Sequence, residues 1–265
     1  MRKIRLTNGR FSVDILPDCG GALGALRWHT PEGLVHDMLA SASAGDIAEQ
    51  STANMSCLPI AVYAQAITGC DTLDEWTVQD ASNIRATLTR HEEGAAKTPH
   101  WNCQALQRFE LTQDGLHVRY TLTNIGVAPV PARIGLRLRL NGRANMQLRG
   151  EMEPVMGTTD SPSCPPPGNF RTGFQFLDQN VQITLRHKKN EFFCTWPEDR
   201  LMLKFTLDHG LNYIGVDYRA AQKQVWLTPL SHAPKDETGH PAFQILQQGD
   251  SLEAILFLSP GVMAA

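Results

Sequence analysis

The fold class is decided by a stretch that runs Leu201-Met202-Leu203-Lys204-Phe205-Thr206-Leu207, in which large apolar residues occupy every second position. A period of two places the apolar side chains on one face of a β-strand, whereas an amphipathic helix needs a period near 3.6. The same alternation recurs in Phe11-Ser12-Val13-Asp14-Ile15 and in Leu116-His117-Val118-Arg119-Tyr120-Thr121-Leu122. These three runs predict strands that each bury one face.

Turn residues separate the alternating runs. The chain has 21 Gly and 16 Pro, and many fall at turn sequences such as Asn8-Gly9, Asp114-Gly115 and Gln248-Gly249-Asp250. The best helical candidate, Ser43 to Ser51, is short and polar, so at most a turn or two of helix is expected there. About a dozen or more short antiparallel strands predict an all-β protein built as one large antiparallel β-sandwich.

The domain organisation follows from length and from one proline-rich segment. A chain of 265 residues suits one large domain or two modest ones. The irregular stretch from Glu151 to Asn169 contains Ser161-Pro162-Ser163-Cys164-Pro165-Pro166-Pro167-Gly168 and could link two domains. Strand patterns of the same kind lie on both sides of it, which favours a single domain over residues 1–265.

Charge and cysteine content exclude several classes of partner. There are 24 Lys and Arg against 27 Asp and Glu, without long runs of one sign, so nucleic acid and anionic membranes are not expected partners. The chain has no apolar run of the roughly 20 residues that cross a bilayer. Its six cysteines show no zinc spacing. We expect a cytoplasmic protein with reduced thiols, without metal or organic cofactor, as a monomer or homodimer.

Seven pieces of the sequence, in collinear order, resemble the aldose 1-epimerase or galactose mutarotase family. The pieces are Ile4–Gly9 with Val13–Leu23, Leu58–Ala64, Phe109–Asn124, Val130–Leu136, Leu177-Asp178, Leu227–Pro234 and Leu246–Leu252. The resemblance spans nearly the whole chain. It implies the family's large antiparallel sandwich, with a pyranose sugar held on a concave face and a retained sugar contact at Asp178. Tyr63, Gln65 and Thr228 are further candidates for sugar binding.

The resemblance also shows where this chain departs from the family. Opening and reclosing a pyranose ring needs one group that donates a proton and one that removes a proton, and the family uses a His and a Glu. The matching positions here are Arg137 and Thr228. A guanidinium does not pass a proton near neutral pH, and an unassisted hydroxyl is a poor base. Anomer interconversion is therefore left open, as is the question whether the protein is an enzyme.

One strand carries a row of arginines. In Arg133-Ile134-Gly135-Leu136-Arg137-Leu138-Arg139-Leu140 the aliphatic residues occupy one face, Arg133, Arg137 and Arg139 share the other, and Gly135 opens space among them. These arginines could simply pair with carboxylates on neighbouring strands of an exposed sheet. The resemblance puts Arg137 at the sugar. Because planar guanidinium groups bond carboxylates and phosphates through two parallel hydrogen bonds, the arginines also suggest an acidic or phosphorylated sugar as ligand.

Other residues are candidates for the missing proton carriers. His232, Asp236, Glu237 and His240 follow Thr228 in a predicted loop, which could fold over the sugar or could be an ordinary solvated loop.

Aromatic residues are candidates for stacking on the sugar. Trp226 and Trp101 could stack on a pyranose or could pack on the sandwich, and His100, beside Trp101, is a candidate for sugar binding and proton transfer.

Three functions remain open at this point: a mutarotase-type isomerase, a non-catalytic sugar-binding protein, and another carbohydrate enzyme, such as a lyase or a hydrolase, on the same scaffold.

Overall fold

The structure is a computed structural model. It describes residues 2–40, 57–63, 75–93, 101–141, 145–155, 169–175, 180–208, 210–233 and 242–263. The helical candidate at 43–51 and the proline run at 161–168 lie outside these ranges, so both expectations stand as predictions.

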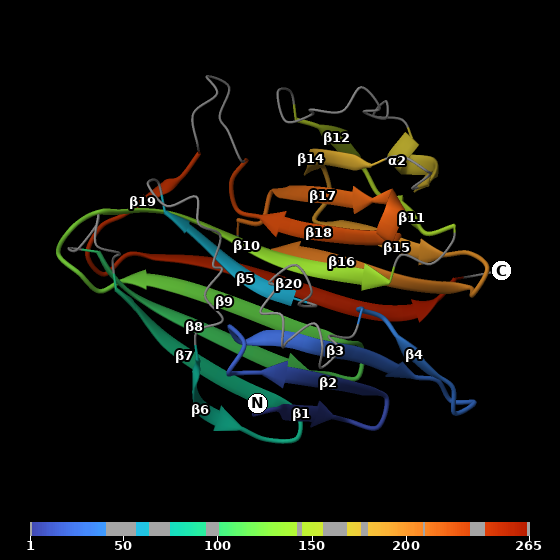
Figure 1. Ribbon diagram of the computed structural model, residues 1–265, viewed down its shortest axis with the longest axis horizontal. Coiled ribbons are helices and arrows are strands. Elements are labelled where there is room, and N and C mark those ends of the chain that lie inside the picture. The colour runs from blue at the N-terminus through green and yellow to red at the C-terminus, as the bar shows by residue number, and fades with distance from the viewer. Residues whose placement is uncertain are drawn as a thin grey trace.

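Two antiparallel sheets stack face to face and form the sandwich (Figure 1). The 11-stranded sheet follows the order β1 (Ile4–Thr7), β2 (Phe11–Leu16), β3 (Ala22–His29), β5 (Cys57–Tyr63), β10 (Val130–Asn141), β18 (Gln224–Leu230), β17 (Tyr213–Arg219), β14 (Val181–His187) and β12 (Met152–Pro154), with β4 (Val35–Asp37) beside β3 and β19 (Gln244–Leu246) beside β10. The 9-stranded sheet follows the order β13 (Phe174–Gln175), β11 (Gln147–Arg149), β15 (Glu191–Trp196), β16 (Leu201–Asp208), β20 (Ser251–Val262), β9 (Leu116–Asn124), β8 (Asn102–Leu111), β7 (Arg85–Glu93) and β6 (Thr77–Ala81). The predicted all-β sandwich is confirmed.

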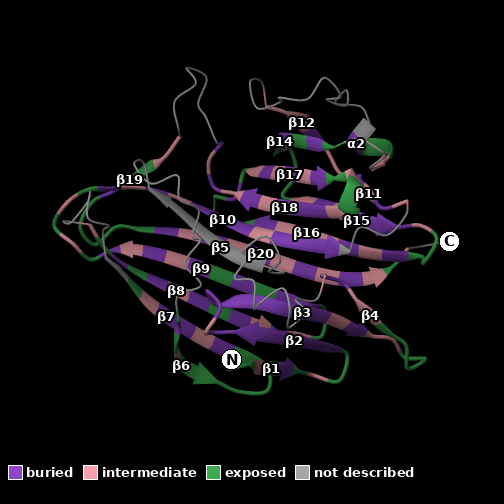
Figure 2. Ribbon diagram, viewed as in Figure 1, coloured by how far each residue is buried: buried purple, intermediate pink, exposed green. Residues whose placement is uncertain are grey.

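One hydrophobic core fills the space between the sheets. It combines side chains such as Leu136 and Leu138 of the 11-stranded sheet with Leu203 and Phe205 of the 9-stranded sheet. Along β16 buried residues alternate with partly exposed ones, as the period of two predicted, and Figure 2 shows this alternation along the strands. Apolar burial on one face of each strand therefore sets the register of the sandwich.

The strand β2 departs from the one-sided burial that its sequence suggested. All six of its residues are buried, including Ser12 and Asp14 on the polar face. The Asp14 carboxylate accepts hydrogen bonds from Arg5 at 2.7 Å and from Arg27 at 3.1 Å. Burial opposes ionisation of this carboxyl, but the two arginines outweigh that effect and lower its pKa. Neighbouring side chains thus cover a strand face that alternation alone assigns to solvent.

The predicted turns and the small helical content are seen where the chain is described. Gly9, Gly115 and Gly249 have φ angles of 83°, 151° and 85°, which favour glycine. The helical elements within the described ranges are α2 (Asn169–Thr172) and the 3₁₀ turn η2 (Ala220–Gln222). Neither these nor any other helix in that part of the chain is long and apolar enough to span a membrane.

Candidate functional site

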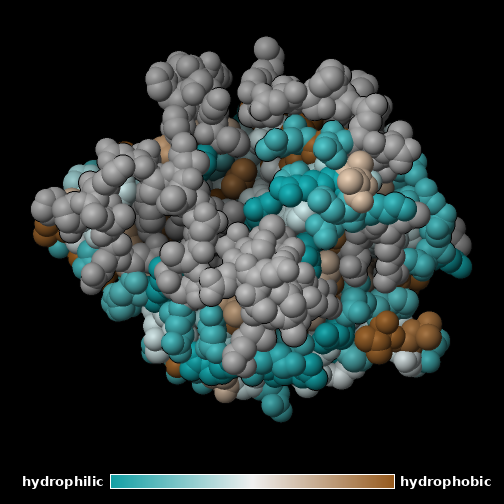
Figure 3. Space-filling model, in the orientation of Figure 1, coloured by the Kyte–Doolittle hydropathy of each residue, from teal (hydrophilic) through white to brown (hydrophobic). Residues whose placement is uncertain are grey.

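The outer face of β10 carries the arginine row that the sequence predicted. Leu136 and Leu138 are 1% and 0% exposed in the core, while Arg133 and Arg137 on the opposite face are partly exposed. β10 lies inside the 11-stranded sheet between β5 and β18, so residues of neighbouring strands flank these arginines. Hydrophilic residues gather on this side of the molecule over β17 and β18 (Figure 3).

Arg137 belongs to a cluster formed with β18 and β17. The Arg137 guanidinium carbon lies 5.5 Å from the centroid of the Trp226 ring, and that of Arg219 lies 5.0 Å from it. Asp217 forms a long ion pair with each of these arginines, with 3.8 Å between its Oδ2 and the Nη2 atom of the arginine. We call Arg137, Trp226, Asp217 and Arg219 the Arg137 cluster. One carboxylate faces two guanidiniums here, so the cluster carries a net positive charge.

Trp226 is 2% exposed, and two guanidiniums lie over its ring. The indole therefore supports the arginines and holds their planes in place through cation–π contacts, each worth about 0.5–2 kcal/mol. A role for Trp226 as a direct stacking platform stays a prediction. Trp101, by comparison, is partly buried and packs against the core.

Thr228 lies beside Arg137, because Gly135 pairs with Leu230 and Leu138 pairs with Leu227 in the register of β10 and β18. Sequence reasoning missed Asp217 and Arg219, although they occupy alternate positions of a strand and so share a face. That alternation was the available signal, but it could not show that β17 lies next to β18.

A second cluster surrounds Arg133 on the same face. The Arg133 guanidinium carbon lies 5.5 Å from the centroid of the Phe243 ring. The backbone N–H of Ile134 donates a hydrogen bond to Ser231 Oγ, and the backbone N–H of Ser231 donates one to the Ile134 carbonyl. These two bonds extend the β10–β18 pairing to this point. That pairing brings His232 next to Arg133. We call Arg133, Phe243 and His232 the Arg133 cluster.

The electrostatics of the Arg133 cluster keep its imidazole neutral. His232 Nδ1 lies 2.9 Å from Ser231 Oγ, in a hydrogen bond that orients the ring. Burial, and secondarily the positive charge of Arg133, lower the pKa of His232 below its usual value. Burial also lowers the pKa of Arg133, which nevertheless remains charged. A neutral, oriented imidazole can exchange a proton with a hydroxyl group.

Leu230 lies between the two clusters. The sequence suggested that Gly135 opens space among the arginines, but a Cβ at that position would lie 2.7 Å from Leu230 Cδ2. The other methyl, Cδ1, would lie 3.7 Å from a Cβ at Gly215 on β17. The side chain of Leu230 therefore fills the space above Gly135, reaches contact distance of Gly215, and forms an apolar ridge between the clusters.

The other predicted site residues stand as follows. Arg139, which was predicted to bind a ligand, is buried, with 4% of its surface exposed. Its role in binding stays a prediction. Tyr63 is opposite Ala132 in the β5–β10 register. The remaining candidates lie outside the described residues: Gln65, His100, Asp178, Asp236, Glu237 and His240.

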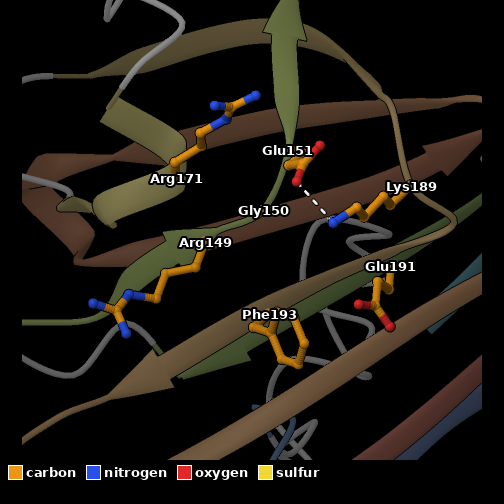
Figure 4. Close-up of a pocket in the computed structure, with 7 residues that line it drawn as sticks. All are labelled: Arg149, Gly150, Glu151, Arg171, Lys189, Glu191 and Phe193. Atoms are coloured by element: carbon orange, nitrogen blue, oxygen red, sulfur yellow. Dashed lines mark ion pairs between the residues drawn. The ribbon is translucent and has the colours of Figure 1, made fainter.

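A separate pocket of about 380 Å³ opens elsewhere, around β11 and β15, and contains none of the predicted site residues (Figure 4). Its carboxylates are already engaged: Glu151 pairs with Lys189 at 2.8 Å, and Glu191 pairs with Lys204 at 2.6 Å. Among the described residues, no group of three or more His, Cys, Asp or Glu is arranged to hold a metal ion.

Comparison with known proteins identifies the fold. No protein-family model matches the sequence, and no curated protein is similar to it. Among solved structures, an aldose 1-epimerase candidate from Escherichia coli K12 is 16% identical, with a TM-score of 0.79 and 99% of each chain covered.

Two further solved structures point to the same fold. A galactose mutarotase-like protein from Clostridium acetobutylicum is 13% identical, with a TM-score of 0.78, over 98% of this chain and 95% of that one. An aldose epimerase homologue from C. elegans is 13% identical, with a TM-score of 0.78 and 99% of both chains covered. The chain therefore has the galactose-mutarotase-like fold, as the seven collinear pieces implied.

Proposed function

We propose that the protein binds an acidic or phosphorylated sugar at the Arg137 cluster, on the outer face of the 11-stranded sheet. The observation that carries this proposal is the pair of guanidiniums held over one tryptophan ring, 5.5 and 5.0 Å from its centroid, with Asp217 at 3.8 Å from each. Planar guanidinium forks match carboxylate and phosphate groups, with two parallel N–H···O bonds each. Asp217 can accept hydrogen bonds from sugar hydroxyls, and the fold is that of proteins whose names refer to sugar epimerisation.

Calorimetric titration tests this binding function. Glucuronate and galacturonate are expected to bind, and neutral glucose and galactose to bind at least tenfold more weakly. Charge-assisted hydrogen bonds contribute about 1.5–3 kcal/mol, so Arg137→Gln should weaken uronate binding by about tenfold or more. Arg108→Gln is the matched control, because Arg108 is an exposed arginine on the 9-stranded sheet. Binding of neutral hexoses without binding of uronates or sugar phosphates would refute the proposal.

Anomer interconversion is a second candidate function, and His232 is the observation that favours it. Its lowered pKa provides an imidazole that is neutral at pH 7 and able to exchange protons. Asp217 does not serve as its partner on the same ring, because Trp226, which pairs with Asp217, is four strand positions from Leu230, or about 13 Å, and His232 lies two residues beyond that end of β18. The second proton carrier would then be Glu237 or His240.

Polarimetry tests the catalytic candidate. If the protein interconverts anomers, it accelerates the change in optical rotation of freshly dissolved α-glucuronate or α-galactose, and His232→Gln abolishes the acceleration. A rate equal to the uncatalysed rate over a panel of neutral and acidic sugars, with binding intact in calorimetry, would identify a non-catalytic sugar-binding protein instead. Release of product from an oligosaccharide would indicate a lyase or a hydrolase.

A further inference from the structure

The two arginine clusters repeat the same arrangement on one sheet face. In each cluster a guanidinium lies 5.5 Å from an aromatic centroid, Arg133 with Phe243 and Arg137 with Trp226. Each cluster also contains a polar group that can bond a hydroxyl, His232 in the first and Asp217 in the second. Cation–π contacts restrict the rotation of both guanidiniums, which lowers the entropic cost of binding an anion there.

The distance between the clusters exceeds the size of one sugar ring. Arg133 and Arg137 are four positions apart on the same face of β10, and a strand rises about 3.3 Å per residue, so their Cα atoms lie about 13 Å apart. The guanidiniums keep this spacing, because Arg133 lies at Phe243 while Arg137 extends towards Trp226, which pairs with Arg139 further along the strand. A single pyranose that bonds Arg137 therefore leaves the Arg133 cluster unoccupied. A ligand that engages both arginines must carry anionic groups on more than one sugar unit.

The ridge between the clusters suits a carbohydrate chain. Leu230 fills the space above Gly135 and lies partly exposed at the surface. A pyranose has an apolar face of C–H groups, and such a face buries apolar area when it packs on an aliphatic side chain. The order along the face is thus anion-binding cluster, apolar ridge, anion-binding cluster.

From this arrangement we infer that the ligand is an acidic oligosaccharide rather than a monosaccharide, with one carboxylate at Arg137, a sugar unit over Leu230 and a second carboxylate at Arg133. This inference rests on the proposed function, because it extends the sugar-binding site at the Arg137 cluster. It adds the chain length of the ligand and a second recognition position.

Titration with galacturonate and with tri-galacturonate at constant ionic strength tests the inference. The trisaccharide should bind at least tenfold more tightly than the monosaccharide, since a second charge-assisted pair forms. Arg133→Gln should remove this gain and leave the affinity for the monosaccharide unchanged. Arg137→Gln should weaken the binding of both ligands, and Arg108→Gln should change neither.

The design separates the two proposals. Equal affinities for the monosaccharide and the trisaccharide, or an equal loss of both in Arg133→Gln, would overturn the two-cluster ligand while the binding function at Arg137 stands. If neither ligand binds, the proposed function itself fails. The unchanged monosaccharide affinity of Arg133→Gln also reports that this variant is folded. Arg133→Lys is a second variant, which keeps the charge but loses the fork, and should retain only part of the gain.

Discussion

The guanidinium of Arg137 lies 5.5 Å from the ring centroid of Trp226, a side chain that is itself 2% exposed. Arg219 approaches the same ring to 5.0 Å, so one indole supports two charged groups. The arrangement explains how this sheet face can present oriented positive charge, because the aromatic ring restricts the planes of both guanidiniums.

Trp226→Ala should lower the free energy of unfolding by about 3–5 kcal/mol, because it removes a fully buried aromatic side chain. Trp226→Phe should cost less, since it keeps a ring below Arg137 and Arg219. Denaturant unfolding measures both changes. Trp101→Ala is a useful comparison, because Trp101 is only partly buried against the core. An equal loss in the Trp101 variant would contradict the importance assigned to Trp226.

Asp217→Asn should tighten uronate binding by about two- to fivefold, because it removes the negative charge that faces Arg137 and Arg219 and a partly exposed charge of this kind is worth up to about 1 kcal/mol. Calorimetry at low ionic strength measures the change, and added salt should reduce it. Asp208→Asn serves as the control, since Asp208 is exposed on the other sheet. The Asn side chain keeps an oxygen that can accept hydrogen bonds from sugar hydroxyls, so weaker uronate binding in Asp217→Asn would contradict this prediction.

Gly135→Ala should destabilise the fold by about 1–3 kcal/mol, because its Cβ would lie 2.7 Å from Leu230 Cδ2 and that side chain must move. Leu230→Ala removes the obstructing methyl groups, so the double variant should be more stable than the sum of the two single changes implies. Thermal or denaturant unfolding of the four proteins completes the cycle. Strict additivity would show that the space above Gly135 is not filled by Leu230.

Stability should fall as the pH is lowered through about 6.5, the ordinary pKa of histidine. The lowered pKa of His232 means that the unfolded chain binds a proton at this position more readily than the folded chain, so acidification favours unfolding. Burial lowers the pKa of His117 also, with the same sign. At a pH well above 6.5 the two histidines do not affect the free energy of unfolding, because they are neutral in both states. Their destabilising effect increases as the pH falls below about 6.5.

His232→Gln should reduce the loss of unfolding free energy between pH 7.5 and 5.5, as measured by denaturant unfolding at each pH. His187→Gln is the matched control. His187 lies outside both clusters, and its Nε2 lies 2.6 Å from the Leu211 carbonyl oxygen. A pH dependence identical to that of the unchanged protein would show that His232 does not titrate below its ordinary range.

The fold was predictable because the strand signal is local. Alternating residues in β9 and β16 place apolar side chains on one face whatever surrounds them, and glycines at 9, 115 and 249 mark turns through their positive φ. β2 shows the limit of this reasoning. Its polar face is covered by arginines from adjacent strands, and alternation within one strand carries no information about such cover.

The sequence by itself determined the period of two, the turn positions and the arrangement of Arg133, Arg137 and Arg139 on one face of a strand, because each depends only on residues close together in the chain. The tertiary structure alone decided which strands lie beside β10. It placed Trp226 and Asp217 at Arg137, set Leu230 over Gly135 and buried Arg139, since these contacts depend on pairing between strands separated by about ninety residues.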